Sequence, residues 1–171
     1  MDELIDYVDD NDQVIGKIKL SEAKEKKLNY RISHIWIIND KRELLICKRP
    51  PTTTSYAGKW TSTAGGHVDT EEIYQTAAER EAKEELGINL KLKRAFKIKF
   101  KYSDNAYRFI DLWYCLDFKD INKINFDKEE ISEHNFISFK ELMEKMDQNH
   151  NIFNPELIQL TKTWISDKNL N

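Results

Sequence analysis

Three glutamates, Glu81, Glu84 and Glu85, have the side-chain type and the spacing to bind one ligand together. They lie in a segment whose pattern predicts a helix over 70–86, where positions i, i+3 and i+4 share a face. Two apolar stripes flank that face, one made by Ala78, Ala82 and Leu86 and the other by Ile73 and Ala77. We therefore expect the three carboxylates to converge on one patch wedged between apolar surfaces.

Such a patch of like charges needs compensation. Like charges at this spacing destabilise a helix by roughly 0.2–0.5 kcal/mol per pair, and burial of the flanking surface increases the repulsion. A hard divalent cation compensates directly, because Mg²⁺ prefers carboxylate and water oxygens. The alternative interpretation is an acidic face that points into water and holds no ligand.

The residues around this helix predict its ends and its exposed side. Asp69 is a suitable N-cap with Glu72 three residues later, and Gly87 accepts the left-handed conformation that ends many helices. A mixed polar face, which we expect to be solvated, consists of Thr76, Glu79, Arg80 and Lys83.

The rest of the pattern predicts the elements that must position the glutamates. Apolar or alternating runs predict strands over 4–8, 14–18, 32–38, 44–47, 90–101 and 107–118, with a turn at 103–105. Helices are expected over 21–27, capped by Ser21, and over 140–146 and 155–166. The segment 50–58, rich in proline and small polar residues, predicts a loop. Strands mixed with helices indicate one α/β domain over 1–171, with 1–28 as an N-terminal hairpin and helix extension.

Composition narrows the class of partner. Of 171 residues, 27 are basic and 30 acidic, giving a net charge of -3, so we expect no nucleic-acid polymer as partner. The first residues are acidic and lack the features of a secretory signal, and no apolar run approaches the roughly 20 residues that span a bilayer. Cys47 and Cys115 fit neither a disulfide framework nor a zinc site. Buried thiols in a reducing cytoplasm are the favoured interpretation.

The segment 66–88 resembles the signature of the Nudix superfamily of hydrolases. The positions that match, each at the family's spacing, are Gly66, Glu72, Arg80, Glu81, Ala82, Glu84, Glu85, Gly87 and Ile88. Alanine at 82, where the family has a larger aliphatic residue, is a mild departure. The resemblance implies an α/β/α sandwich with a mixed central sheet and a pyrophosphatase that cleaves diphosphate linkages, often of a nucleotide, with Mg²⁺ or Mn²⁺ (manganese) as cofactor.

The same resemblance implies roles for individual residues. Glu81, Glu84 and Glu85 would bind the metal, and Glu72 would contact it indirectly or through water. Arg80 would orient the carboxylates by ion pairing. A carbonyl of Gly65 or Gly66 would add a ligand, and glycine there allows close approach of a phosphate.

Residues outside the signature helix complete the predicted site. A general base takes the proton of the attacking water; Glu130 is the candidate from a later loop, and a signature glutamate is the alternative. Glu130 could equally be an ordinary surface carboxylate. Arg49, Lys59 and Gly65 are candidate substrate-binding residues, the two basic ones because they could hold a phosphate.

A further likeness, to type I isopentenyl-diphosphate isomerases, is carried by 60–67 with Arg49 upstream and covers most of the first 90 residues. Those isomerases need a cysteine near the position of Gly65, where this chain has none, so hydrolysis is favoured over isomerisation. A non-catalytic nucleotide-binding module is a third interpretation, disfavoured because every signature glutamate is kept. His34 is expected in the core and His67 in loop packing. Tyr102, Tyr107 and Trp113 are expected in the core or at a homodimer surface.

Overall fold

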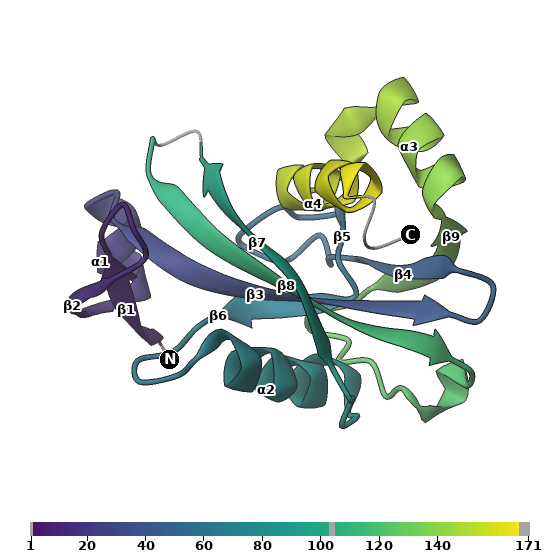
Figure 1. Ribbon diagram of the computed structural model, residues 1–171, viewed down its shortest axis with the longest axis horizontal. Helices are drawn as coiled ribbons and strands as arrows, with labels where there is room; N and C mark the ends of the chain where they lie inside the picture. The colour runs from purple at the N-terminus through teal and green to yellow at the C-terminus, as the bar shows by residue number, and fades with distance from the viewer. Residues whose placement is uncertain (1, 103–104, 168–171) are drawn as a thin grey trace.

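The computed structural model describes residues 2–102 and 105–167. Within these ranges nine strands form one mixed sheet, and helices cover both of its faces (Figure 1). The strands are β1 (Leu4–Val8), β2 (Val14–Lys19), β3 (Asn29–Asn39), β4 (Glu43–Lys48), β5 (Trp60–Thr61), β6 (Ala64–His67), β7 (Lys93–Lys101), β8 (Tyr107–Phe118) and β9 (Glu133–Ser138). The helices are α1 (Leu20–Glu25), α2 (Tyr74–Leu86), α3 (Phe139–Gln148) and α4 (Pro155–Ser166), with short 3-10 turns at Ile121–Lys123 and His150–Ile152.

Strand β3 organises the sheet. It pairs with β1, β4 and β6 in antiparallel register and with β8 in parallel register. Side chains alternate between the two faces of a strand, and both faces of β3 are covered. Trp36 and Ile38 enter the core beneath α3 and α4, whereas Ile35 and Ile37 enter the core against α2. This double coverage explains why β3 reads as a nearly continuous apolar run.

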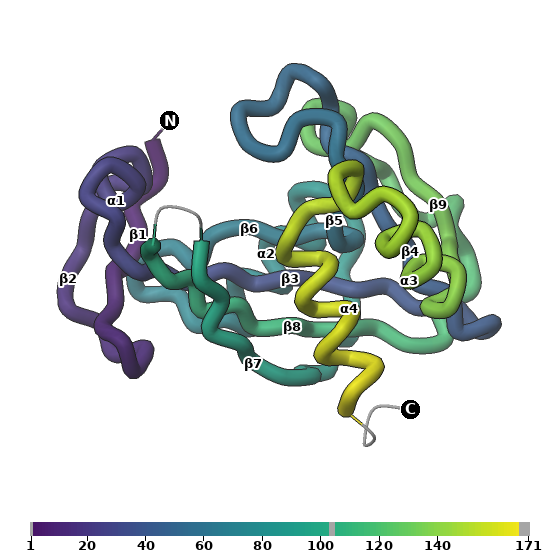
Figure 2. The backbone as a smooth tube through the Cα atoms, turned by 90° about the horizontal axis from the view of Figure 1, so that it is seen from above, coloured from purple at the N-terminus to yellow at the C-terminus, as the bar shows by residue number. Residues whose placement is uncertain are grey.

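The N-terminal hairpin and the C-terminal helices lie at different ends of the sheet. Figure 2 shows β1, β2 and α1 at one end of the molecule and β9 with α3 at the other. The predicted α/β/α arrangement is confirmed, with α2 on one face and α3 and α4 on the other. No helix in the described part of the chain is long and apolar enough to cross a membrane.

Several predicted boundaries are wrong for identifiable reasons. Ser21 does not cap α1, because its backbone N–H and hydroxyl both donate to Asp2 instead. Helix α2 begins at Tyr74, after the left-handed φ of 68° at Glu71, so Asp69 is not its N-cap. Strand β7 begins at Lys93, and Ile73, assigned to an apolar stripe, is 64% exposed. Ser103 and Asp104 of the predicted turn lie outside the described residues.

Other predictions are confirmed. Helix α4 has the predicted bounds, with Pro155 in its first turn, and α2 ends at Gly87, whose φ is 64°. His34 is buried, as expected. Trp113, one of the three aromatic residues expected in the core or at a homodimer surface, lies in the core against α2.

Candidate active site

An acidic cavity of about 470 Å³ lies at the junction of α2, β6 and the loop that precedes β9. Eight residues that the sequence analysis singled out line it: Arg49, Gly65, Gly66, Arg80, Glu81, Glu84, Glu85 and Glu130. Glu3, His67, Asp69 and Asp127 complete the lining. Helix α2 contributes four of these side chains: Glu81, Glu84 and Glu85 share one side of it, as their spacing predicts, and Arg80 joins them.

Arg80 holds the acidic residues of this cavity together. Its Nη1 donates to Glu81 Oε1 over 2.6 Å and to Glu84 Oε2 over 3.1 Å. Its Nε and Nη2 donate to the carboxylate of Glu72 over 3.1 and 3.0 Å. The side chain is only 27% exposed, so the prediction that Arg80 belongs to a solvated face is wrong. A guanidinium, with five donors in a fixed plane, can serve several carboxylates at once.

Two of the glutamates, Glu81 and Glu85, lie partly buried beside each other. Burial raises the pKa of the Glu85 carboxyl well above its usual value, and the nearby Glu81 charge raises it further, against a hydrogen bond from Gly65 N–H. Burial also raises the pKa of Glu81, although the Arg80 charge opposes this. Glu84, in contrast, is 58% exposed at the mouth of the cavity. The cavity therefore holds anionic groups at a cost in free energy that a cation would relieve.

Strand β6 reaches the glutamates closely enough to exclude a side chain. A Cβ at Gly66 would overlap the Glu81 carboxylate, so the backbone of Gly66 stands directly against that group. A side chain at position 66 would therefore have to displace the Glu81 carboxylate from its present position. The next strand, β3, fixes this backbone through the register that pairs Ser33 with Gly66 and His34 with Gly65.

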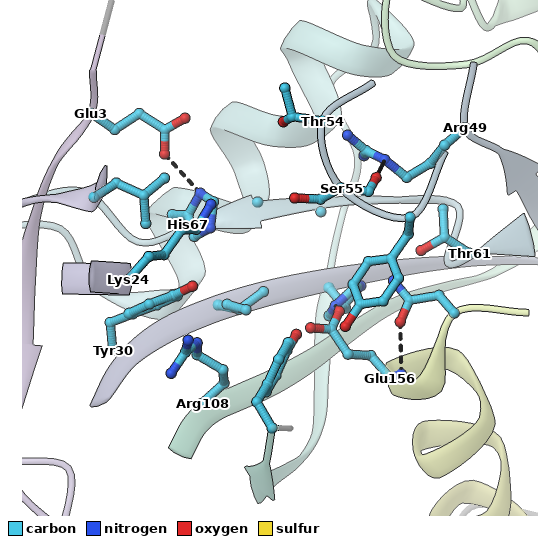
Figure 3. Close-up of a pocket in the computed structure, with 18 of the residues that line it drawn as sticks. Glu3, Lys24, Tyr30, Arg49, Thr54, Ser55, Thr61, His67, Arg108 and Glu156 are labelled. Carbon is cyan, nitrogen blue, oxygen red and sulfur yellow. Dashed lines mark hydrogen bonds and ion pairs between the residues drawn. The ribbon is translucent and has the colours of Figure 1, made fainter. Parts of the chain in front are cut away.

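Glu130 is brought to the cavity by a loop anchored on the end of α2. The N–H groups of Asn125 and Asp127 donate to the free carbonyls of Leu86 and Glu85, over 2.9 and 2.8 Å, which satisfies groups that a helix end leaves unpaired. Across the cavity, Arg49 Nη2 lies 3.4 Å from Glu130 Oε2. Arg49 Nε also donates to the Ser55 carbonyl over 2.9 Å, which ties the 50–58 loop to the site (Figure 3).

Glu3 and His67 are site residues that the sequence analysis did not assign. Glu3 comes from the N-terminal segment, and its Oε2 lies 2.7 Å from His67 Nδ1 (Figure 3). Both residues line the acidic cavity. Nothing in the sequence near Glu3 signals this position, because the contact joins residues 64 apart in the chain.

A family model described as the NUDIX domain matches residues 28–160, which is most of this chain. The chain belongs to the Nudix family. Enzymes of this family are hydrolases acting on pyrophosphate bonds of small molecules, and they generally use divalent metal ions.

Individual proteins are also similar to this chain in sequence. An uncharacterised Nudix hydrolase of Streptomyces coelicolor is 30% identical over 143 residues, covering 82% of this chain and 77% of that protein. Isopentenyl-diphosphate Delta-isomerase 2 of Photorhabdus laumondii is 34% identical over 94 residues, covering 55% of this chain and 53% of that protein.

Solved structures share the fold. A crystal structure of a Deinococcus radiodurans protein superposes with a TM-score of 0.81 at 20% identity, covering 94% of this chain and 98% of that one. A bifunctional NMN adenylyltransferase/ADP ribose pyrophosphatase of Francisella tularensis, complexed with AMP and a manganese ion, has a TM-score of 0.60 at 17% identity. That match covers 81% of this chain and 42% of the other.

Other residues that the sequence analysis considered lie outside the lining of the acidic cavity. Lys59 lines neither the acidic cavity nor the larger cavity beside it; its Nζ lies 5.8 Å from the centre of the Tyr56 ring. Glu72 lies behind Arg80 and outside the lining. Cys47 is buried in the core, where burial raises its thiol pKa, and neither it nor Cys115 lines either cavity.

The acidic side chains of this Nudix domain are not grouped as a ready-made metal cage. Among the described residues, no three His, Cys, Asp or Glu side chains are close enough together to hold a metal ion. Arg80 instead bridges Glu81 and Glu84. Metal binding would therefore exchange part of the Arg80 network for contacts with the ion.

Proposed function

We propose that this chain hydrolyses the diphosphate linkage of a nucleoside-diphosphate-type small molecule, using Mg²⁺ or Mn²⁺ bound at the acidic cavity. The observation that carries the proposal is that Glu81 and Glu85 lie partly buried side by side in the wall of this cavity, where partial burial raises the pKa of both carboxyls. The charged forms of two such neighbouring carboxylates become favourable when a divalent cation joins them. A cytoplasmic location, which the two unpaired cysteines favour, is part of this proposal.

The donors at the cavity fit a hard cation. Glu81, Glu84 and Glu85 offer carboxylate oxygens, and the Gly66 backbone, pressed against Glu81, offers a carbonyl. Oxygen ligands of this kind suit Mg²⁺ and Mn²⁺. When bound, the ion would supply charge neutralisation at the diphosphate and a more acidic water. The manganese ion in the Francisella tularensis structure supports the choice of metal.

The protein's own residues would divide the remaining work. Arg49 would hold a phosphate by hydrogen bonds from its guanidinium. Glu130, beside Arg49 and facing the same cavity, would accept the proton of the attacking water. Arg80 would keep Glu81 and Glu84 oriented while the ion is bound or released.

The proposal is tested by a hydrolysis screen with and without Mg²⁺, in which chromatography separates the phosphate-bearing products from the substrate. The substrates are nucleotide sugars, dinucleotide cofactors, dinucleoside polyphosphates, nucleoside di- and triphosphates and prenyl diphosphates. We expect metal-dependent hydrolysis of at least one nucleotide, reduced by at least about 100-fold in Glu85→Gln, as expected for loss of a group that stabilises the transition state.

The matched control is Glu79→Gln on the same helix, which is exposed and bonded only to Gln75 among the described residues. It should turn over like the wild type. Unchanged turnover in Glu85→Gln would remove Glu85 from the metal site. Conversion of isopentenyl diphosphate to dimethylallyl diphosphate, without hydrolysis of any substrate, would replace hydrolysis by isomerisation.

A further inference from the structure

A larger cavity of about 630 Å³ opens beside the acidic one. Six residues line both: Glu3, Arg49, Gly65, Gly66, His67 and Glu130. Its volume lies within the range of small-molecule sites, roughly 300–1,000 Å³. A substrate whose diphosphate is held at the acidic residues would therefore have room for its organic group in the adjacent larger cavity.

A buried, hydrogen-bonded pair of side chains forms part of the lining of this larger cavity. His34, from the middle of β3, and Glu156, from the first turn of α4, are each 4% exposed. His34 Nε2 and Glu156 Oε2 are 2.7 Å apart. In the tautomer that carries its proton on Nε2, His34 donates to the carboxylate of Glu156. His34 Nδ1 has no hydrogen-bond partner among the described residues.

The fold supplies a reason for the carboxylate to lie at this depth. Glu156 is at the N-terminal end of α4, where the helix dipole favours a negative charge. Its backbone N–H donates to the Asn154 side chain over 2.8 Å. Figure 3 shows the Glu156 side chain reaching from α4 toward the interior of the cavity.

The rest of the wall fits a planar polar group. Tyr30, Tyr56 and Tyr102 line the cavity, together with the cationic side chains of Lys24 and Arg108. Arg108 is stacked on Tyr30 and Tyr102, with its Cζ 3.9 and 4.7 Å from their ring centres. A hydrocarbon chain would leave the polar side chains of this wall without a hydrogen-bonding ligand, whereas a polar ring can offer them donors and acceptors.

We infer that the larger cavity binds the nucleobase of the substrate, and that Glu156, held by His34, accepts a hydrogen bond from a base amino group. The inference rests on the proposed function. With one carboxylate oxygen on His34, the other is the acceptor presented to the ligand. Glu156 is then a specificity-determining residue that favours adenine, cytosine or guanine over bases and chains without an amino group.

The Glu156→Gln variant distinguishes recognition of the base amino group from a purely structural role of Glu156. His34 Nε2–H would keep its bond by pairing with the amide oxygen, which leaves the NH₂ group toward the ligand. A donor would thus replace an acceptor at the position that meets the base amino group. Loss of a merely structural contact would lower stability without changing the preference between ligands that differ in that one group.

The test measures binding of nucleoside 5′-monophosphates by calorimetry in three pairs that differ only by the amino group. The pairs are AMP with purine riboside monophosphate, CMP with pyrimidin-2-one riboside monophosphate, and GMP with IMP. In the wild type, we expect the amino-bearing member of at least one pair to bind about 10- to 100-fold more tightly, the range for one hydrogen bond to a charged group. In Glu156→Gln this ratio should vanish or invert, while exposed Glu144→Gln on α3 should keep it.

These outcomes are independent of turnover, because monophosphates contain no diphosphate bond to cleave. A retained amino preference with no hydrolysis in the screen would support this inference and contradict the proposed function. Equal affinities within all three pairs, or no binding of any monophosphate at millimolar concentration, would overturn it. So would a ratio unchanged in Glu156→Gln, and thermal unfolding of each variant shows whether it is folded in the assay.

Discussion

At the scale of single residues, the site divides its carboxylates by exposure. Glu85 and Glu81 are partly buried and share repulsion, whereas Glu84 is exposed and is held by Arg80. This difference in exposure suits the exchange of a metal ion, because the exposed Glu84 can turn toward an ion before Glu81 and Glu85 rearrange. Glu130 stands apart on its own loop, next to the positive charge of Arg49.

Glu130 and its neighbour Glu129 allow a direct test of the general base. Replacing Glu130 with Gln keeps the shape of the side chain but removes its ability to take a proton. If Glu130 is the base, kcat should fall by about 10²- to 10⁴-fold, the usual contribution of general base catalysis. Steady-state kinetics on the best substrate of the screen measures this.

Glu129→Gln is the control, because Glu129 is exposed and lines neither the acidic nor the larger cavity. Its kcat should stay within about threefold of the wild type, since surface substitutions of this kind have small effects. A loss of less than tenfold in Glu130→Gln would assign the proton transfer to a glutamate of α2.

At the scale of elements, the N-terminal hairpin holds the loop that leads into α2. Asp6 in β1 accepts from the Thr70 hydroxyl over 2.5 Å and from the Glu71 N–H over 3.3 Å. Thr70 N–H also donates to the Leu4 carbonyl over 3.0 Å. Residues 2–27, which lie outside the family match, thus fix the backbone next to Glu72 and, through it, Arg80.

Asp6→Ala tests whether this anchoring reaches the chemistry. The loop would lose two hydrogen bonds and the orientation of Glu72, so we expect kcat to fall by about tenfold and the free energy of unfolding by about 1–3 kcal/mol. Asp9→Ala is the matched control, because it replaces the same residue type in the same hairpin. Asp9 accepts hydrogen bonds from the N–H groups of Asn11 and Gln13 in the β1–β2 turn, away from the site. Asp9→Ala should lose stability and keep kcat. Equal kcat values in both variants would reduce the hairpin to a structural role.

Elements whose signals are local were predictable from the sequence. Helix α4 was found to the residue because Pro155 marks its first turn and its apolar periodicity is unbroken. The end of α2 was equally clear at Gly87. Its start was misplaced because Asp69 and Glu72 do form a capping-type contact, Asp69 N–H to Glu72 Oε2 over 3.1 Å, but in a turn that precedes the helix.

The candidate site was predictable only where it is local. Its acidic half was foreseen because six of the eight lining residues named in advance fall within 65–88, where the spacing on one helix and its preceding strand decides the geometry. The contacts from outside that stretch depend on sheet register and helix docking. Glu3 with His67 and His34 with Glu156 pair across 64 and 122 residues, and no periodicity in the sequence encodes such distances.

At the scale of the whole molecule, the acidic cavity is a local excess of negative charge in a chain of net charge only -3. The sheet and α2 must hold this excess in place, and without a cation the folded state bears its cost. A ligand that binds only the folded state adds RT ln(1 + [L]/Kd) to the free energy of unfolding. The proposed metal site therefore has a consequence for stability as well as for activity.

Magnesium should accordingly raise the unfolding temperature of the wild type. At a concentration ten times its Kd, Mg²⁺ adds about 1.4 kcal/mol, which is about 3–6 °C for a domain of this size. Glu85→Gln, free of one buried charge, should unfold at a higher temperature than the wild type without metal and gain little from Mg²⁺. Calorimetry with NaCl added to equal ionic strength separates specific binding from screening. An equal shift in wild type and variant would locate the stabilising ion elsewhere and leave the burial of Glu85 without its proposed explanation.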